Sequence, residues 1–158
     1  MKSLLLAMLV ALPAGAALAA DAEVPYPDGY RHWHHVKSMV IEAGHPLFES
    51  FGGIHHLYAN ALAVEGYRAG RFADGAVIVF DLLEAQYADA AISEGPRKVL
   101  GVMHKDAGRY AETGGWGFEG FAGGDSQQRA VGANAASACF ACHAPQQEHD
   151  YVFSRMRD

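Results

Sequence analysis

The chain has 158 residues and carries 18 acidic against 12 basic side chains, which gives a formal net charge of −6. A chain of this length can bury one sizeable hydrophobic core, and it is too short for two domains of ordinary size. Its acidic balance argues against nucleic acid or an anionic membrane as a partner, because both attract basic surfaces.

The first residues have the features of a secretory signal peptide. Lys2 supplies a positive charge, residues 4–12 are apolar, and Ala17-Leu18-Ala19 is a small-residue cleavage pattern. The apolar stretch is too short to span a bilayer stably, so we expect cleavage after Ala19 rather than a retained membrane anchor. We predict a signal peptide at 1–19 and a single domain at 20–158, exported to the periplasm and not bound to the membrane.

A helical period appears early in the predicted domain. Four apolar residues, Tyr30, Trp33, Val36 and Val40, recur at intervals of three and four positions. This spacing predicts a helix over residues 28–42.

Three histidines, His32, His34 and His35, fall in this predicted helix. His32 and His35 would share one face and could begin a metal site, but no third ligand is in reach. We therefore expect a solvated helix face here.

The centre of the chain predicts an antiparallel sheet. The segments with strand patterns are 54–60, 76–83, 97–105 and 116–121, with a short helix at 61–67 and a loop at Glu94-Gly95-Pro96. The run at 76–83 is the most strand-like because it is rich in β-branched residues. On a two-residue period, Ile78, Phe80 and Leu82 face the same side of this strand.

The end of the chain predicts two further helices, at 133–143 and 150–156. The order of elements gives an α+β fold class: one antiparallel β-sheet packed with a few helices, the helix at 133–143 carrying the motif described next. Eighteen glycines and the β-branched run after Asp74-Gly75 argue against a four-helix bundle.

Both cysteines of the protein lie in the segment Cys139-Phe140-Ala141-Cys142-His143. This C-x-x-C-H pattern is the attachment signature of a c-type haem. Two thiols at this spacing can add to the haem vinyl groups, while the adjacent imidazole binds the iron. We predict one covalent haem c, with thioethers at Cys139 and Cys142 and with His143 as the axial ligand. A redox C-x-x-C pair, a structural disulfide and half of a zinc site are the alternatives.

The role of such a haem depends on whether a second side chain binds the iron. An electron carrier usually has two strong axial ligands, whereas a gas binder or an enzyme leaves one position open. The side chains that could supply a second ligand are Met39, Met103, Met156, His55, His56 and His104. An apolar core role is ordinary for each methionine, and the histidines stay open as candidates.

Several further motifs occur in a fixed order along the chain. They are Tyr26-Pro27, Tyr30, Trp33, Phe72-Ala73-Asp74-Gly75, Lys105-Asp106, Gly114-Gly115-Trp116-Gly117-Phe118, the C-x-x-C-H motif and Val152-Phe153. This series resembles the cytochrome P-460 superfamily over nearly all of the predicted domain.

The resemblance implies one of two branches that differ in the haem pocket. The cytochromes P-460 proper oxidise hydroxylamine and carry a lysine cross-linked to the haem and a distal carboxylate. Here the position matching the lysine is Phe80, and the carboxylate position falls near Gly101. The chain therefore resembles the other branch, cytochrome c′-beta, whose five-coordinate haem is capped by two phenylalanines. By motif register these are Phe51 and Phe80, with Phe48 as the alternative to Phe51.

The resemblance and the haem motif together predict a periplasmic, homodimeric cytochrome that binds nitric oxide and carbon monoxide at a Phe-capped haem face. Its role would be nitric oxide sequestration, detoxification or transfer, more than turnover as an enzyme, and a redox partner is a further possibility. Two alternatives remain: a P-460-like enzyme that oxidises hydroxylamine or nitric oxide, and a simple electron-transfer cytochrome.

Overall fold

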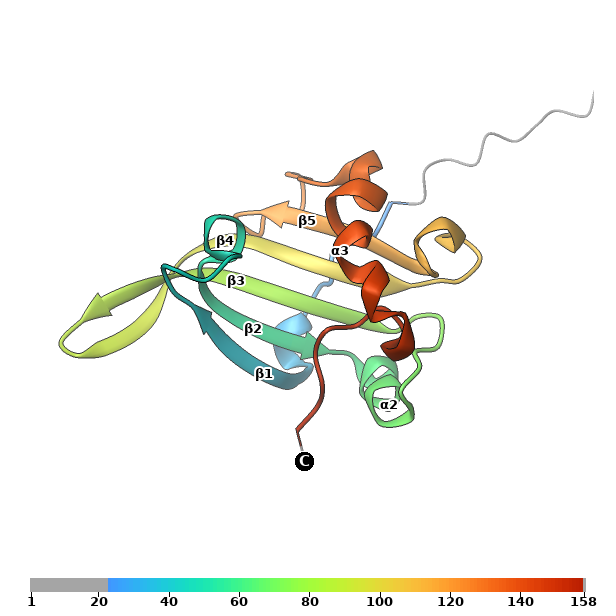
Figure 1. The fold of residues 1–158 in the computed structure, drawn as a ribbon, viewed down its shortest axis with the longest axis horizontal. Coiled ribbons are helices and arrows are strands. Elements are labelled where there is room, and N and C mark those ends of the chain that lie inside the picture. Colours follow the sequence, from blue (N-terminus) through green and yellow to red (C-terminus); the bar gives the residue numbers. More distant parts are fainter. Residues whose placement is uncertain (1–22, 158) are drawn as a thin grey trace, which may run out of the picture.

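The computed structural model describes residues 23–157, so the predicted signal peptide lies outside the described residues. One antiparallel sheet with the strand order β1-β2-β3-β4-β5 forms its centre (Figure 1). The strands are β1 (His34–Ile41), β2 (Gly53–Ala59), β3 (Val77–Ala88), β4 (Ala91–Lys105) and β5 (Trp116–Ala122). The helical elements are η1 (Tyr30–His32), α1 (Phe48–Phe51), α2 (Ala61–Ala69), η2 (Ala111–Thr113), η3 (Gly132–Asn134), η4 (Ala136–Phe140), α3 (Ala141–His143) and η5 (Ala144–His149).

This architecture confirms the predicted α+β class with one antiparallel sheet, and it is not a helical bundle. The C-terminal helical segment carries the C-x-x-C-H motif, as expected. None of the helices in residues 23–157 is long and apolar enough to cross a membrane.

Strand alternation gives the sheet two faces with separate cores. Ile78 of β3 belongs to one core, against which Cys139 and Phe140 of the C-terminal segment pack. Val79, the next residue, belongs to the other core together with Tyr30 of η1. Figure 1 shows the C-terminal helical segment in front of the sheet and the η1 turn behind it. We call these sides the motif face and the η1 face.

The segment predicted as a helix over 28–42 is mostly a strand, β1, and only Tyr30–His32 is helical. β1 pairs antiparallel with β2, and the pairing shifts register between His35 and Lys37. This bulge inserts an extra residue, so the apolar positions no longer alternate and their spacing imitates a helical period.

The three histidines of this segment are exposed, but they do not share a helix face. His32 ends η1, whereas His34 and His35 begin β1. His35 Nε2 lies 2.8 Å from Ser38 Oγ, which in turn lies 2.7 Å from His56 Nδ1. The structure thus replaces the predicted solvated helix face with a polar surface on two paired strands.

The predicted loop at Glu94-Gly95-Pro96 is wrong, because these residues lie within β4. Strands β3 and β4 form a long hairpin that extends past the other strands (Figure 1) and turns at Asp89-Ala90. Both turn residues have positive φ angles, 51° and 58°, a conformation that Asn or Gly usually signals. Pro96 has no N–H for the ladder, and it lies where the register shifts between Leu83 and Ala85.

The C-terminal region is helical around the haem motif, but it is a series of short 3-10, π and α turns rather than one regular helix. The helix predicted over 133–143 is therefore confirmed in position and irregular in form. The final helix predicted over 150–156 is wrong. Asp150 and Tyr151 have positive φ angles of 52° and 65°, which end the helical path.

The remaining predictions for the centre are confirmed, since the predicted strands correspond to β2, β3, β4 and β5 and the predicted helix at 61–67 corresponds to α2. The Asn60 side chain caps α2 by accepting a hydrogen bond from the Ala63 N–H at 2.9 Å. Gly70 ends the helix with a φ of 74°.

Gly53, the first residue of β2, has a φ of 128°, and a Cβ at this position would clash with the Leu83 carbonyl oxygen. We expect Gly53→Ala to lower the free energy of unfolding by at least about 2 kcal/mol, measured by guanidinium denaturation. Gly44→Ala is the control, because Gly44 also has a positive φ, 95°, but a Cβ added there would meet no atom within 4 Å. Its loss should be about 1 kcal/mol, and equal losses in the two variants would contradict the clash.

Candidate haem-binding site

The two predicted attachment cysteines lie on consecutive short helical elements, Cys139 in η4 and Cys142 in α3. Both are free thiols; Cys139 is half-buried and Cys142 is exposed. Burial, together with Glu119 and Cys142 nearby, raises the pKa of the Cys139 thiol. Both side chains lie on the segment that packs on the motif face.

His143 is held in one orientation by its surroundings. Its Nδ1 lies 2.7 Å from the carbonyl oxygen of Tyr151. A carbonyl only accepts, so Nδ1 carries the proton and Nε2 keeps its lone pair. The rings of Phe118 and Phe153 each lie 4.9 Å from the imidazole, centroid to centroid. Burial lowers the pKa of His143, which favours the neutral ring that binds metals.

The predicted distal residues Phe51 and Phe80 contact each other. Their ring centroids are 5.8 Å apart and the rings are nearly perpendicular, at 87°. Phe80 lies on the motif face of β3 and is half-buried, whereas Phe51 ends α1 and is 40 % exposed. Phe48 begins the same short helix, and its ring lies against Gly52. Of the two candidates for the second cap, Phe51 is therefore the one found in contact with Phe80.

Two paired positions of β4 and β5 next to Phe80 are glycines and therefore carry no side chain. Gly101 pairs directly with Phe80 across β3 and β4, and Gly120 pairs with Gly101 on the other side. A Cβ on Gly101 would lie 3.4 Å from the Phe80 side chain. Glycine in a strand interior often marks a place where a ligand approaches the backbone closely. Phe80 and Gly101 are therefore direct cross-strand neighbours on the motif face.

The candidate residues for a second iron ligand do not all lie on the same face of the sheet. Met39, Met103 and His55 lie on the motif face with Phe80, whereas His56 and His104 lie on the η1 face. Met156 lies in the tail beyond the last helical element. The two histidines of the η1 face are therefore on the opposite side of the sheet from the cysteines.

His55 is buried and packs against Phe80, with ring centroids 4.6 Å apart. Its Nε2 donates a hydrogen bond to the Phe51 carbonyl oxygen at 2.7 Å. Lys98 Nζ donates to the next carbonyl, that of Gly52, at 2.8 Å. These two bonds tie the segment that carries Phe51 to the sheet.

The residues fit a haem c. The two thiols are free, His143 has one ring nitrogen satisfied and the other available, and Gly101 leaves backbone without a side chain beside Phe80. Large apolar side chains also stay exposed on this side, including Met39 at 48 % and Phe153 at 54 %. Apolar surface of this kind is what a flat, largely apolar macrocycle would cover.

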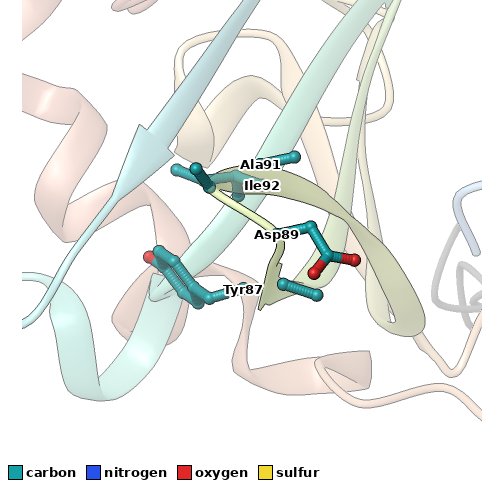
Figure 2. A pocket seen from close by; sticks show the side chains of 6 residues that line it. Tyr87, Asp89, Ala91 and Ile92 are labelled. Atoms are coloured by element: carbon teal, nitrogen blue, oxygen red, sulfur yellow. The ribbon is translucent and has the colours of Figure 1, made fainter.

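A separate pocket lies at the tip of the β3–β4 hairpin. Figure 2 shows Tyr87, Asp89, Ala91 and Ile92 around it. Its lining contains neither cysteine nor histidine, so it holds none of the residue types of the C-x-x-C-H motif. The predicted haem-attachment residues therefore lie on the motif face and not in this pocket.

The fold and these side chains define a haem-binding cytochrome that is built on an antiparallel sheet. The family model Cytochrome P460 matches residues 27–154, so the chain belongs to the cytochrome P460 family. No curated protein matches the chain at a significant level.

Sequence reasoning missed the groups that orient the site. They are the Tyr151 carbonyl, the rings of Phe118 and Phe153, and the side chain of His55 in its bond to Phe51. Phe118 and Phe153 occur in the ordered motifs, but without a role attached. A backbone carbonyl has no sequence signal at all, since every residue carries one.

Burial lowers the pKa of His55 below its ordinary value of 6.5, an effect that its bond to Phe51 only partly offsets. The unfolded chain therefore takes up the proton at a higher pH than the folded protein does. As the pH falls below about 6.5 towards the lowered pKa, we expect the free energy of unfolding to fall, and this ring contributes up to about 1.4 kcal/mol per pH unit to that loss.

His55→Gln should flatten this slope in denaturant unfolding, while His34→Gln, at an exposed histidine of β1, should leave it unchanged. An unaltered slope in His55→Gln would show that the ring does not stay neutral in the folded protein.

Proposed function

We propose that this protein is a periplasmic c-type cytochrome of the c′-beta kind that binds nitric oxide and carbon monoxide. Thioethers to Cys139 and Cys142 hold a single haem, and His143 is its only protein ligand to iron. The protein sequesters, detoxifies or transfers nitric oxide, and it does not turn over hydroxylamine. When bound, the haem supplies an iron with one position open to a diatomic gas.

The observation that carries this proposal is the cross-strand pair Phe80 and Gly101 on the motif face. By the family resemblance, Phe80 matches the position of the cross-linking lysine of the hydroxylamine-oxidising branch, and the position of its carboxylate falls near Gly101. A phenyl ring cannot form the cross-link, and a glycine cannot accept a proton from a substrate. The chain therefore lacks both special groups of that enzyme branch at adjacent positions.

The phenylalanine pair explains which ligands are favoured. The edge-to-face rings of Phe51 and Phe80 exclude water and offer no conventional hydrogen-bond donor. Bound dioxygen gains negative charge and needs such a donor, whereas nitric oxide and carbon monoxide depend on it less. An apolar cap thus selects for the two latter gases.

His55 supports this selectivity. Its Nε2–H is committed to the Phe51 carbonyl, so in this arrangement that donor does not reach a bound gas. The ring acts instead by holding Phe51 against Phe80.

Export to the periplasm after cleavage behind Ala19 belongs to the same proposal, because c-type haem is attached outside the cytoplasm. We also propose a homodimer.

Ligand titration of the purified holoprotein tests the proposal. The ferrous protein should bind nitric oxide and carbon monoxide and should form no stable complex with dioxygen. Hydroxylamine should not be oxidised faster than by a denatured sample of the same protein. Sustained hydroxylamine turnover would overturn the proposal in favour of a P-460-like enzyme.

Replacement of Phe80 tests the cap. Phe80→Ala removes the ring that Phe51 and His55 contact, so association of carbon monoxide should speed up by about tenfold, measured by flash photolysis. Phe121→Leu is the control, because Phe121 is fully buried in the core of the η1 face. Unchanged association in Phe80→Ala would show that Phe80 does not restrict access to the iron.

Peptide mass spectrometry tests the attachment. The haem should be found on the peptide that contains Cys139 and Cys142 and on no other peptide. In Cys139→Ser/Cys142→Ser, the haem should separate from the chain in denaturant, although His143 is intact. A third bond, for example to a lysine, would contradict the assignment to the gas-binding branch.

A further inference from the structure

The Tyr151 carbonyl that accepts the His143 Nδ1 proton lies on unusual backbone. Asp150 and Tyr151 are consecutive non-glycine residues with positive φ, 52° and 65°. This region is unfavourable for residues with a side chain, and it persists only where surrounding contacts impose it. The conformation that aims the carbonyl at His143 must therefore be held from outside the turn.

Three donors hold Asp150, and they come from distant parts of the chain. Lys105 Nζ donates to Asp150 Oδ1 at 2.7 Å, and the Phe72 N–H donates to Oδ2 at 2.8 Å. The indole Nε1 of Trp116 donates to the Asp150 carbonyl oxygen at 2.8 Å. Both carboxylate oxygens and the main-chain oxygen of Asp150 are thus satisfied.

The anchors are buried. Lys105 is 7 % exposed, Asp150 is 8 % exposed, and Trp116 is not exposed at all. Lys105 Nζ also donates to the Gly114 carbonyl at 3.1 Å and lies 5.0 Å from the centre of the Trp116 ring. A buried ion pair of this kind contributes little net stability, because desolvation of the two charges offsets their attraction. Conformational specificity is the better account of its presence.

The turn is fixed on its other side as well. The Tyr151 N–H donates to the Gln146 carbonyl at 2.8 Å. The Tyr151 ring packs on Phe140, with centroids 5.2 Å apart, and covers Gly114, where a Cβ would clash with it. The carbonyl facing His143 therefore has little freedom to move.

We propose that Lys105, Asp150 and Trp116 are positioning residues that hold the Tyr151 carbonyl on the His143 Nδ1 proton and thereby set the strength of the bond between His143 and iron. A firm hydrogen bond at Nδ1 makes Nε2 a stronger donor to the metal. This inference rests on the proposal that His143 is the iron ligand. It adds that β4 and β5, and not only the haem motif, control that ligand.

Two variants loosen the turn by different routes. Trp116→Phe keeps an aromatic ring and removes the donor to the Asp150 carbonyl. Asp150→Asn keeps an acceptor and a residue that tolerates positive φ, but it leaves Lys105 without its counter-charge. The control is Asp81→Asn, which breaks the ion pair, 2.6 Å long, between the buried Asp81 and the partly buried Arg97 on the opposite face of the sheet.

The measurement is resonance Raman spectroscopy of the ferrous holoprotein, with the His143–iron stretching band assigned by isotope labelling. In Trp116→Phe and Asp150→Asn the band should move to lower frequency and the reduction potential should rise. Loss of His143 from iron after nitric oxide binds should be about tenfold faster. Asp81→Asn should lose stability in denaturant without moving the band.

An unmoved band in Trp116→Phe, with the wild-type band present, would overturn the inference and leave the proposed function standing. A shift of equal size in Asp81→Asn would also overturn it, because the effect would then follow from destabilisation alone. Absence of any histidine–iron band in the wild-type protein would instead overturn the proposed function, in which His143 is the only protein ligand of a five-coordinate iron. If Asp150→Asn does not fold, Trp116→Phe alone decides the outcome.

Discussion

The alternation of side chains along β3 is the constraint on which both the site and its scaffold depend. Phe80 points to the motif face, whereas Asp81 points to the η1 face and accepts hydrogen bonds from Tyr30 and Arg97, each 2.6 Å long. Burial raises the pKa of Tyr30 to about 12, which keeps its hydroxyl a donor to Asp81. A slip of one residue in register would exchange the faces and put a carboxylate where the phenyl ring lies. The buried Asp81 cluster therefore protects the apolar character of the site.

Strand β4 links the two sides of the candidate haem site. Gly101 and Lys105 are four positions apart on this strand and so lie on the same face. Gly101 leaves open backbone beside Phe80, and Lys105 holds the turn whose carbonyl accepts the His143 proton through Asp150. The proposed distal cap and the proposed proximal anchor are thus built on one rigid element. Such placement suits a site that must hold its geometry while small ligands come and go.

Local patterns predicted most of this fold, and non-local contacts account for what they missed. β2, α2 and β5 follow from strand patterns and capping residues within a few positions. The strand β1 was mistaken for a helix because its bulge disturbs the alternation, a feature set by pairing with β2. In the site, C-x-x-C-H is local and therefore visible. The contact between Lys105 and Asp150 joins residues 45 positions apart, and positive φ at a non-glycine residue has no reliable sequence signal.

In the proposed function, His143 is the only side chain on the iron, and the face capped by Phe51 and Phe80 is open to a gas. The optical spectrum of the ferrous holoprotein before any ligand is added tests this most directly. We expect a five-coordinate, high-spin haem c without the red-shifted bands of a lysine cross-link. A low-spin, six-coordinate spectrum would contradict it, because a second side chain would then occupy the position assigned to nitric oxide.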